Sequence, residues 1–279
     1  MYRQTSFISR VVLWSAILFV STVFATSSLD DISSSITGFS QGGCDLINSA
    51  RWSAALGNPA ILASTQQKDG VCVENSKWFM GTSIQQLAFS YSFGQIGLNA
   101  GVTRLVDDSG FEMTSITGTA NGIEYYNENI AYLAVGQKIL GIDAGLSFKQ
   151  YFKKAVEEKT FNSLDLGFKY QLSNWQAALK LNNIAGNFSK NDKIFYYSLG
   201  LGCNLYDFSL NIEYIDFVRK IRWGGGYANN LFSLNAGLDE DNNISAGVSV
   251  SLLGINFDYG YKNIDLLGVV NRFGISLTF

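Results

Sequence analysis

The stretch that decides the fold is the last one, Arg272-Phe273-Gly274-Ile275-Ser276-Leu277-Thr278-Phe279. Aromatic and aliphatic side chains alternate in it with small or polar side chains. Successive side chains of a strand point to opposite faces, so Phe273, Ile275, Leu277 and Phe279 form one apolar face. Such a strand, ending on an aromatic residue, is typical of the closing strand of a barrel in lipid. An edge strand of a soluble sandwich is the alternative for this stretch alone.

The same period of two recurs from Val71 onward and predicts about fourteen strands. Their connections alternate in length. Gly94-Gln95, Ser173-Asn174 and Leu253-Gly254 are examples of tight turns, and the long connections span 107–127, 151–160, 182–194 and 262–271. The 107–127 connection is long enough to contain a further irregular strand, which would change the count by two. We therefore predict an all-β, transmembrane, antiparallel up-and-down β-barrel, with the tight turns and both termini periplasmic.

The composition agrees with a barrel in lipid. Charged residues make up 15% and aromatic residues 14% of the 279 residues, with 28 glycines, whereas an ordinary soluble domain has about 25% charged residues. Low charge combined with many glycines and aromatics fits strands that face lipid outside and carry small residues inside.

The N-terminal residues 1–25 have the pattern of a secretory signal peptide. Arg3 and Arg10 precede the uncharged apolar run Val11–Phe24, and Ala25 offers a small residue for cleavage. A transmembrane anchor is the alternative, but the run is shorter than the roughly 20 residues that span a bilayer.

Residues 26–70 differ from the strands that follow. Leu46, Ile47, Ala50, Ala54 and Ala55 recur at helical spacing and predict a helix within Asp45–Ala63. Gly57 would be its C-cap, and Pro59, the only proline, would stop it. A barrel of about fourteen strands is too wide for its own side chains to fill. We therefore expect residues 26–70 to be a hatch inside the barrel, and residues 71–279 to be the barrel.

Two stretches carry a resemblance to known families. The segment Arg51–Leu62, with Gly57-Asn58-Pro59-Ala60 at its centre, resembles the N-terminal segment of the FadL superfamily and its PorV/PorQ branch. The final strand resembles the C-terminal signature of bacterial outer-membrane barrels, which the insertion machinery recognises. The resemblance implies a fourteen-stranded outer-membrane barrel with an N-terminal hatch.

The resemblance leaves the function open between three classes. A PorV/PorQ-type protein would serve secretion or surface attachment of cargo proteins in type IX systems. A FadL-like channel would pass hydrophobic small molecules, and a structural barrel would transport nothing. The short chain favours the PorV/PorQ branch, because the fatty-acid transporters of the superfamily are longer. The expected partners are outer-membrane lipid, the barrel-assembly machinery, and a secreted cargo or hydrophobic ligand.

Charged residues expected on the inner face give the lumen its chemistry. These candidates are Arg104, Asp143, Lys149, Asp165, Lys169, Glu213, Arg222, Asp258 and Arg272. They could pair across strands and stiffen the wall, or they could line a selective passage.

Several kinds of function find no support in the residues. The chain has no histidine, the usual general base and metal ligand, and no carboxylate pair or cluster has a catalytic or metal-binding spacing. We therefore expect no enzyme, no cofactor and no metal. The formal charge of −3 argues against nucleic-acid binding. Of Cys44, Cys72 and Cys203, the first two could form a bridge in the periplasm, or each could stay unpaired and buried.

Overall fold

A computed structural model describes residues 35–279 except 65–68, 79–80, 108–110, 115–119, 125–126, 155–157, 186–194, 217–218 and 266–267. The predicted signal peptide lies outside these residues, as does the first part of the predicted hatch. Among the described residues, no helix combines the length and the apolar character that crossing a membrane requires.

Strands dominate the described part of the chain. They are β1 (Gly70–Lys77), β2 (Thr82–Phe93), β3 (Ile96–Asp107), β4 (Phe111–Thr114), β5 (Ala120–Glu124), β6 (Asn127–Ile139), β7 (Ile142–Lys154), β8 (Glu158–Leu172), β9 (Trp175–Ala185), β10 (Tyr196–Leu205), β11 (Phe208–Ile215), β12 (Lys220–Ala228), β13 (Phe232–Leu238), β14 (Ile244–Leu252), β15 (Ile255–Ile264) and β16 (Gly268–Thr278). Within this part, fourteen of them form a closed antiparallel up-and-down barrel, which confirms the predicted fold.

The barrel closes where its last strand meets its first. β16 pairs with β1 along its length, from Gly70 opposite Thr278 to Lys77 opposite Asn271. The backbone N–H of Phe279 extends the pairing by donating to the carbonyl of Asp69 at 3.1 Å. Both ends of the wall therefore lie at the end of the barrel that carries the tight turns.

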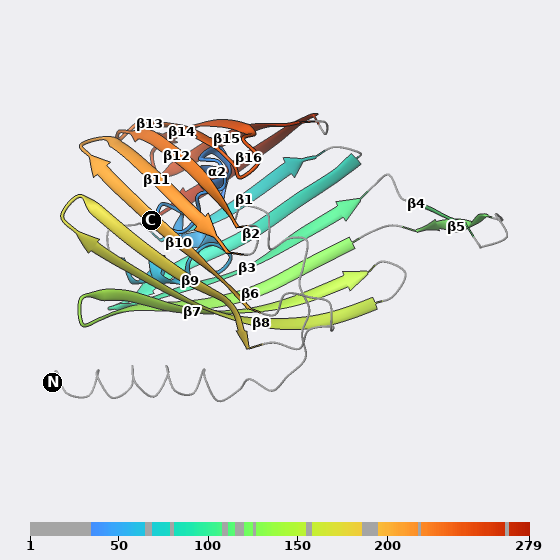
Figure 1. Ribbon diagram of the computed structural model, residues 1–279, viewed down its shortest axis with the longest axis horizontal. Coiled ribbons are helices and arrows are strands. Elements are labelled where there is room, and N and C mark those ends of the chain that lie inside the picture. The colour runs from blue at the N-terminus through green and yellow to red at the C-terminus, as the bar shows by residue number, and fades with distance from the viewer. Residues whose placement is uncertain are drawn as a thin grey trace.

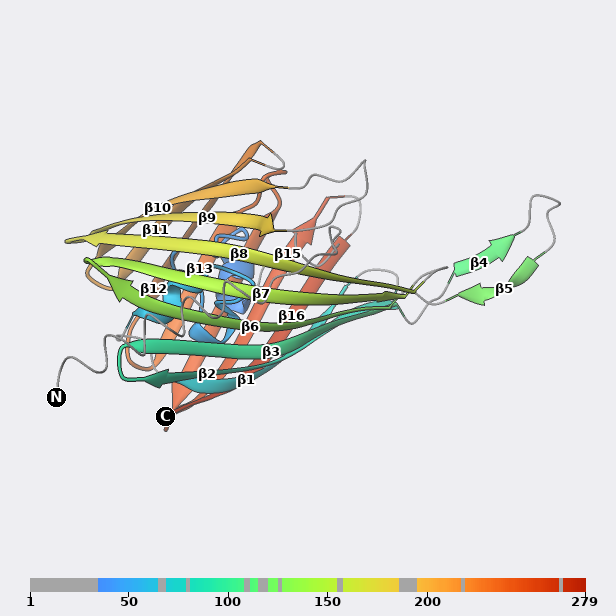
Figure 2. The ribbon, with the colours of Figure 1, turned by 90° about the horizontal axis from the view of Figure 1, so that it is seen from below.

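β4 and β5 pair only with each other and lie outside the barrel wall. They project from the end of the barrel opposite the tight turns (Figures 1 and 2). The extra strands foreseen in the 107–127 connection thus form a separate hairpin and leave the barrel count at fourteen within the described residues.

The predictions of long connections at 151–160 and 262–271 were wrong. β7 runs to Lys154 and β8 starts at Glu158, and these strands pair up to that point. β15 runs to Ile264 and β16 starts at Gly268, and the two pair in register up to that point. The polar residues Lys262, Asn263 and Asn271 therefore belong to paired strands.

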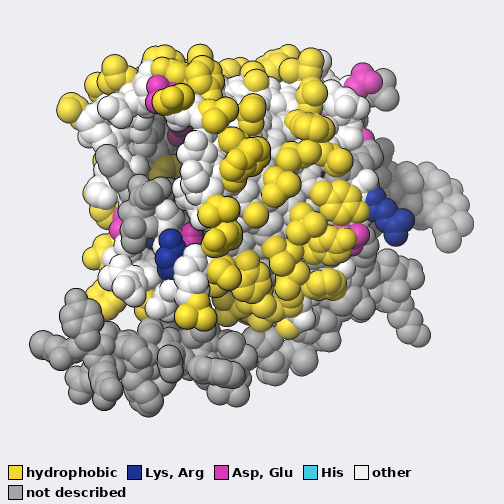
Figure 3. All heavy atoms as spheres, turned by 60° about the vertical axis from the view of Figure 1, so that its left-hand side comes forward, with side chains coloured by type: hydrophobic (Ala, Val, Ile, Leu, Met, Phe, Trp, Pro, Cys, Tyr) yellow, Lys and Arg dark blue, Asp and Glu magenta, His cyan; other side chains and the backbone are white. Residues whose placement is uncertain are grey.

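The outer surface of the barrel is apolar. Phe273 and Leu277 are 54% and 47% exposed, whereas Arg272 and Ser276 between them are 3% and 1% exposed. Hydrophobic side chains cover a broad area of the outer face, and charged side chains lie mostly towards its margins (Figure 3). The alternation predicted for the last strand therefore separates the outside from the inside of the barrel.

Residues 35–64 lie inside the barrel, where α2 (Ile36–Ser40), η2 (Arg51–Ser53) and η3 (Pro59–Ala63) fill it (Figure 1). We call residues 35–64 the inner segment. The predicted helix over 45–63 was wrong: only the short 3₁₀ helices η2 and η3 form there. The backbone N–H groups of Leu46 and Ala55 donate to the wall side chains Glu213 and Asn99 instead of to helical carbonyls.

A pair of neighbouring substitutions tests which face meets lipid. Val248 lies at the centre of β14 and points outward, whereas Ser249 points inward and faces Asp258 across the ladder. In phospholipid vesicles, Val248→Arg should lower the free energy of unfolding by about 2–4 kcal/mol, because it places a charge in lipid. Ser249→Arg should cost much less, since the new cation lies opposite a carboxylate. Urea titration measures both, and equal losses would contradict the assignment of the faces.

Candidate functional site

The candidate site is the contact between the inner segment and the inside of the barrel wall. Glycines on most strands point inward and let the inner segment approach the wall backbone. We call Gly97, Gly136, Gly145, Gly167, Gly224, Gly237, Gly247 and Gly260 the glycine belt. A Cβ atom on Gly145 would lie 2.2 Å from the carbonyl oxygen of Pro59, and one on Gly97 would lie 2.1 Å from that of Leu62.

The belt follows the register of the sheet. Gly97 faces Gly136, Gly136 faces Gly145, and Gly145 faces Gly167, so four neighbouring strands carry glycine at one level. On the other side of the barrel Gly224 faces Gly237 and Gly247 faces Gly260. Any side chain at these positions would push the inner segment away from the wall.

Asn58, Pro59 and Ala60 occupy the part of the belt formed by β6, β7 and β8. Asn58 is the N-cap of η3: its Oδ1 accepts from the N–H of Ala60 at 3.1 Å, and its Nδ2 donates to the carbonyl of Leu46 at 2.9 Å. Pro59 occupies the first turn, where its missing N–H costs nothing. The prediction that Pro59 stops a helix was therefore wrong, since it starts one. Gly57 ends the preceding turn, with its N–H 2.9 Å from the carbonyl of Ser53.

Charged side chains of the wall hold the inner segment by its backbone carbonyls. Lys169 Nζ donates to the carbonyl of Ile47 at 2.9 Å, and Lys180 Nζ donates to that of Leu56 at 2.6 Å. Arg222 Nη1 donates to the carbonyl of Gly43 at 3.3 Å. Predicted lumen cations therefore contact the inner segment directly.

Amide side chains make the matching contacts on the opposite side of the barrel. Gln41 Nε2 donates to Asn235 Oδ1 at 2.8 Å, and Asn211 Nδ2 donates to Gln41 Oε1 at 3.0 Å. Ser245 accepts from the N–H of Gly42 at 2.9 Å. The inner segment is thus fixed by hydrogen bonds to strands from both halves of the wall.

Two groups of buried charges link neighbouring strands. Asp165 Oδ2 lies 3.0 Å from Lys149 Nζ and 3.2 Å from Lys180 Nζ. Glu74 Oε2 lies 2.6 Å from Arg272 Nη2, which also donates to Gln86 at 3.1 Å. The second group joins β1 to β16 and therefore spans the position where the barrel closes.

Of the remaining lumen candidates, two lie on the inside of the barrel and one lies on the outside. Asp143 is buried and pairs with Lys138 at 3.3 Å, and Asp258 lies on the inward parity of β15, between Ser249 and Gly274. Arg104 was assigned wrongly. It is exposed and shares the parity of Leu98 and Val102, which are 39% and 49% exposed, so its side chain lies outside the barrel.

Burial affects the pKa values of two groups outside the strands, Cys44 and Asp239. Burial, followed by the nearby Glu213 carboxylate, raises the pKa of the Cys44 thiol far above its usual value, so the thiol stays protonated. Burial alone would raise the pKa of Asp239, but hydrogen bonds from Lys262 and Asn243 hold it below its usual value. The loop carboxylate therefore stays charged at neutral pH.

The three cysteines are free, and Cys44 and Cys72 are both buried without a bridge. Across the described residues, no group of three or more His, Cys, Asp or Glu side chains is placed to hold a metal ion.

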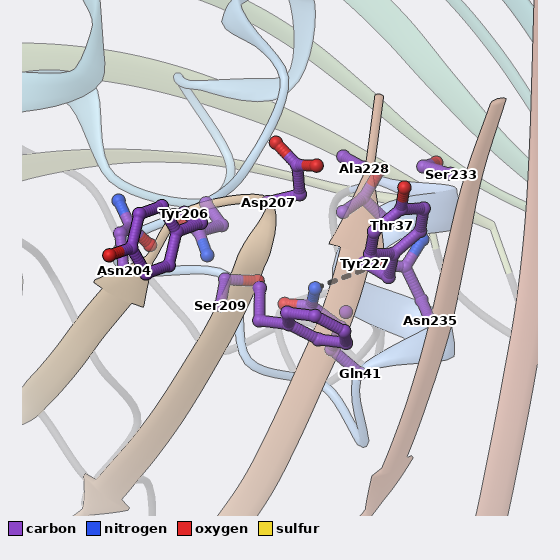
Figure 4. A pocket seen from close by; sticks show the side chains of 13 residues that line it. Thr37, Gln41, Asn204, Tyr206, Asp207, Ser209, Tyr227, Ala228, Ser233 and Asn235 are labelled. Atoms are coloured by element: carbon purple, nitrogen blue, oxygen red, sulfur yellow. Dashed lines mark hydrogen bonds between the residues drawn. The ribbon is translucent and has the colours of Figure 1, made fainter. Parts of the chain in front are cut away.

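A polar cavity of about 370 Å³ lies between the inner segment and the tight-turn end of β10–β13. Gln41 comes from the inner segment, Asp207 from the turn before β11, Ser209 from β11, and Asn235 from β13 (Figure 4). The sequence analysis did not single out this cavity.

The sequence analysis also missed the glycine belt and the asparagines Asn99 and Asn211. Their signal was present in the sequence: each lies on the inward parity of a strand whose other parity is apolar. Reading glycines by parity, as was done for the charged residues, would have found the belt.

Comparison with known proteins supports the fold and leaves the family open. No protein-family profile and no curated protein matches the sequence. Among solved structures, the CymD monoaromatic hydrocarbon channel is similar with a TM-score of 0.59 and 11% identity, over 89% of this chain and 98% of CymD. A mutant of Rhodopseudomonas blastica porin covers 76% of this chain and 99% of its own, with 11% identity and a TM-score of 0.44. The chain shares the barrel fold of CymD.

The buried charges make a testable contribution to stability. Asp165→Asn should lower the free energy of unfolding by about 3–5 kcal/mol, because two buried lysines lose their shared carboxylate. Lys138→Gln is the control: Lys138 is 59% exposed in its pair with Asp143, so its loss should cost about 0–1 kcal/mol. Urea unfolding in vesicles gives both values, and a cost below 1 kcal/mol for Asp165→Asn would show that the cluster does not stabilise the wall.

Proposed function

We propose that this chain is a bacterial outer-membrane barrel whose lumen is closed by its own inner segment, and that it acts on secreted proteins as a PorV/PorQ-type component. The observation that carries the proposal is the seating of the inner segment on the glycine belt. A lumen filled by tightly packed backbone is a poor route for solutes, so function is directed to the ends of the barrel.

The end opposite the tight turns is the place we assign to a protein partner. It carries the connections from β7 to β8 and from β9 to β10, and the projecting β4–β5 hairpin (Figure 2). We assign this end to the cell exterior and the tight turns and termini to the periplasm. On this proposal the inner segment is a hatch, and the strand ending at Phe279 is the signal for barrel assembly.

A channel for hydrophobic small molecules is the second candidate. Two observations favour it: the fold shared with CymD, whose name describes a monoaromatic hydrocarbon channel, and an apolar hollow of about 720 Å³ on the outer face of β9–β14. Trp175, Leu210 and Trp223 line this hollow around Gly202, Gly224 and Gly237.

A deletion strain separates the two candidates. Loss of the gene should cause proteins destined for the surface to accumulate in the periplasm, while uptake of radiolabelled toluene stays unchanged. Normal surface proteins combined with reduced toluene uptake would reject the secretion role and support the channel.

The orientation is tested by single cysteines in a background in which the native cysteines are replaced. Lys154→Cys, at the end of β7 away from the tight turns, should react with an impermeant maleimide on intact cells. Asn174→Cys, in the tight turn between β8 and β9, should react only after permeabilisation. The reverse labelling pattern would overturn the orientation.

The closure of the lumen is tested at Gly145. Gly145→Val should raise single-channel conductance in planar bilayers, because its side chain would displace Pro59 from the wall. Ala144→Val, on the outward parity of the same strand, is the matched control and should leave conductance low. Both variants should keep the gel-mobility difference between boiled and unboiled samples. Deleting residues 26–70 should give the same open channel, and an unchanged conductance in the deletion would show that the inner segment does not close the barrel.

A further inference from the structure

We propose that the polar cavity at the tight-turn end is a binding site for a neutral sugar. The cavity measures about 370 Å³, which is within the usual range of small-molecule sites. A sugar site here would be separate from the proposed function, because the cavity lies at the end of the barrel opposite the projecting hairpin.

Gln41, Asn48 and Asn235 line the cavity, and Asn211 behind them links them into one chain of hydrogen-bonded carboxamides. Asn48 Nδ2 donates to Asn211 Oδ1 at 3.2 Å, Asn211 donates to Gln41, and Gln41 donates to Asn235. These bonds fix the orientation of each amide before any ligand arrives, so little side-chain entropy is lost on binding.

The fixed amides keep unused hydrogen-bonding capacity. A carboxamide has two N–H donors and an oxygen with two lone pairs. Gln41 uses one donor and one lone pair in the chain, and Asn235 uses one lone pair. Both donors and acceptors thus remain for a ligand, which suits hydroxyl groups, since each hydroxyl both donates and accepts.

The other lining side chains extend this match. Ser209 and Ser233 come from the inward parity of β11 and β13, and Thr37 adds a hydroxyl from the inner segment (Figure 4). Asp207 is the one charged residue of the described lining. A carboxylate that accepts from two hydroxyls is a strong acceptor for a diol.

The same composition argues against other ligand classes. Among the residues that the structure describes, no lysine or arginine lines the cavity, so a phosphate or carboxylate ligand would find no opposite charge there. An apolar ligand would cover the unused donors and acceptors of the carboxamides without bonding them, at about 1–3 kcal/mol for each buried group. A neutral polyhydroxyl compound matches the described lining best.

The test is binding of defined sugars to the full-length protein refolded in detergent. Isothermal titration with maltotriose and with N,N′-diacetylchitobiose should give saturable binding of at least one of them. Ser209→Tyr and Ser233→Tyr each place a ring in the cavity and should weaken binding at least tenfold. Leu234→Phe, an outward substitution next to Ser233, should leave affinity unchanged, and unaltered gel mobility shows that each variant is folded.

A second arm distinguishes a cell-wall glycan from a soluble sugar. If the protein cosediments with purified peptidoglycan sacculi and Ser233→Tyr abolishes this, the site binds the cell-wall glycan. If the protein binds maltotriose but not sacculi, the site binds a soluble sugar. The proposal is overturned if neither sugar nor sacculi bind, if both tyrosine variants bind as well as the parent chain, or if triglycine binds more tightly than the sugars.

Discussion

The pairing of β16 with β1 is the contact on which the structure depends. In lipid, each backbone N–H and C=O needs a partner within the protein, and a sheet achieves this only when it has no free edge. The register from Gly70–Thr278 to Lys77–Asn271 removes both edges at once. Glu74 and Arg272 lie within this pairing and join the same two strands on the lumen side. Closure therefore relies on backbone pairing within the wall and on a buried ion pair on the lumen side of the wall.

Closure of fourteen strands creates a second requirement, because the enclosed space exceeds what inward side chains can fill. The protein meets it with backbone: small residues on the wall allow the inner segment to approach, and wall amides and cations satisfy its polar groups. The buried lysines thus have two roles. Lys180 pairs with Asp165 on the neighbouring strand and donates to the carbonyl of Leu56 in the lumen. The wall and the inner segment therefore share one network.

The period of two allowed the barrel, its strand count and its faces to be predicted, because alternation reports directly which side of a strand is buried. The inner segment could not be predicted as well. Local spacing favoured a helix over 45–63, yet Glu213 and Asn99 take hydrogen bonds from Leu46 and Ala55, and these partners are distant in sequence. Arg104 was misplaced for a different reason. Its parity was already visible in Leu98 and Val102, and charge was given more weight than register.

The order in which the chain is made has a consequence for the inner segment. It precedes the whole wall in sequence, yet Gln41 binds Asn235, 194 residues later, and Gly42 binds Ser245, 203 residues later. Contacts between such distant residues form late in folding, because the intervening chain has to be ordered first. On the outer-membrane location proposed above, the inner segment would cross the periplasm without its partners, and its buried residues Ile36, Phe39, Leu46 and Ile47 would need shielding from aggregation until the last strands are in place. We therefore expect a newly formed barrel to pass through a short-lived open state, which ends when this segment docks.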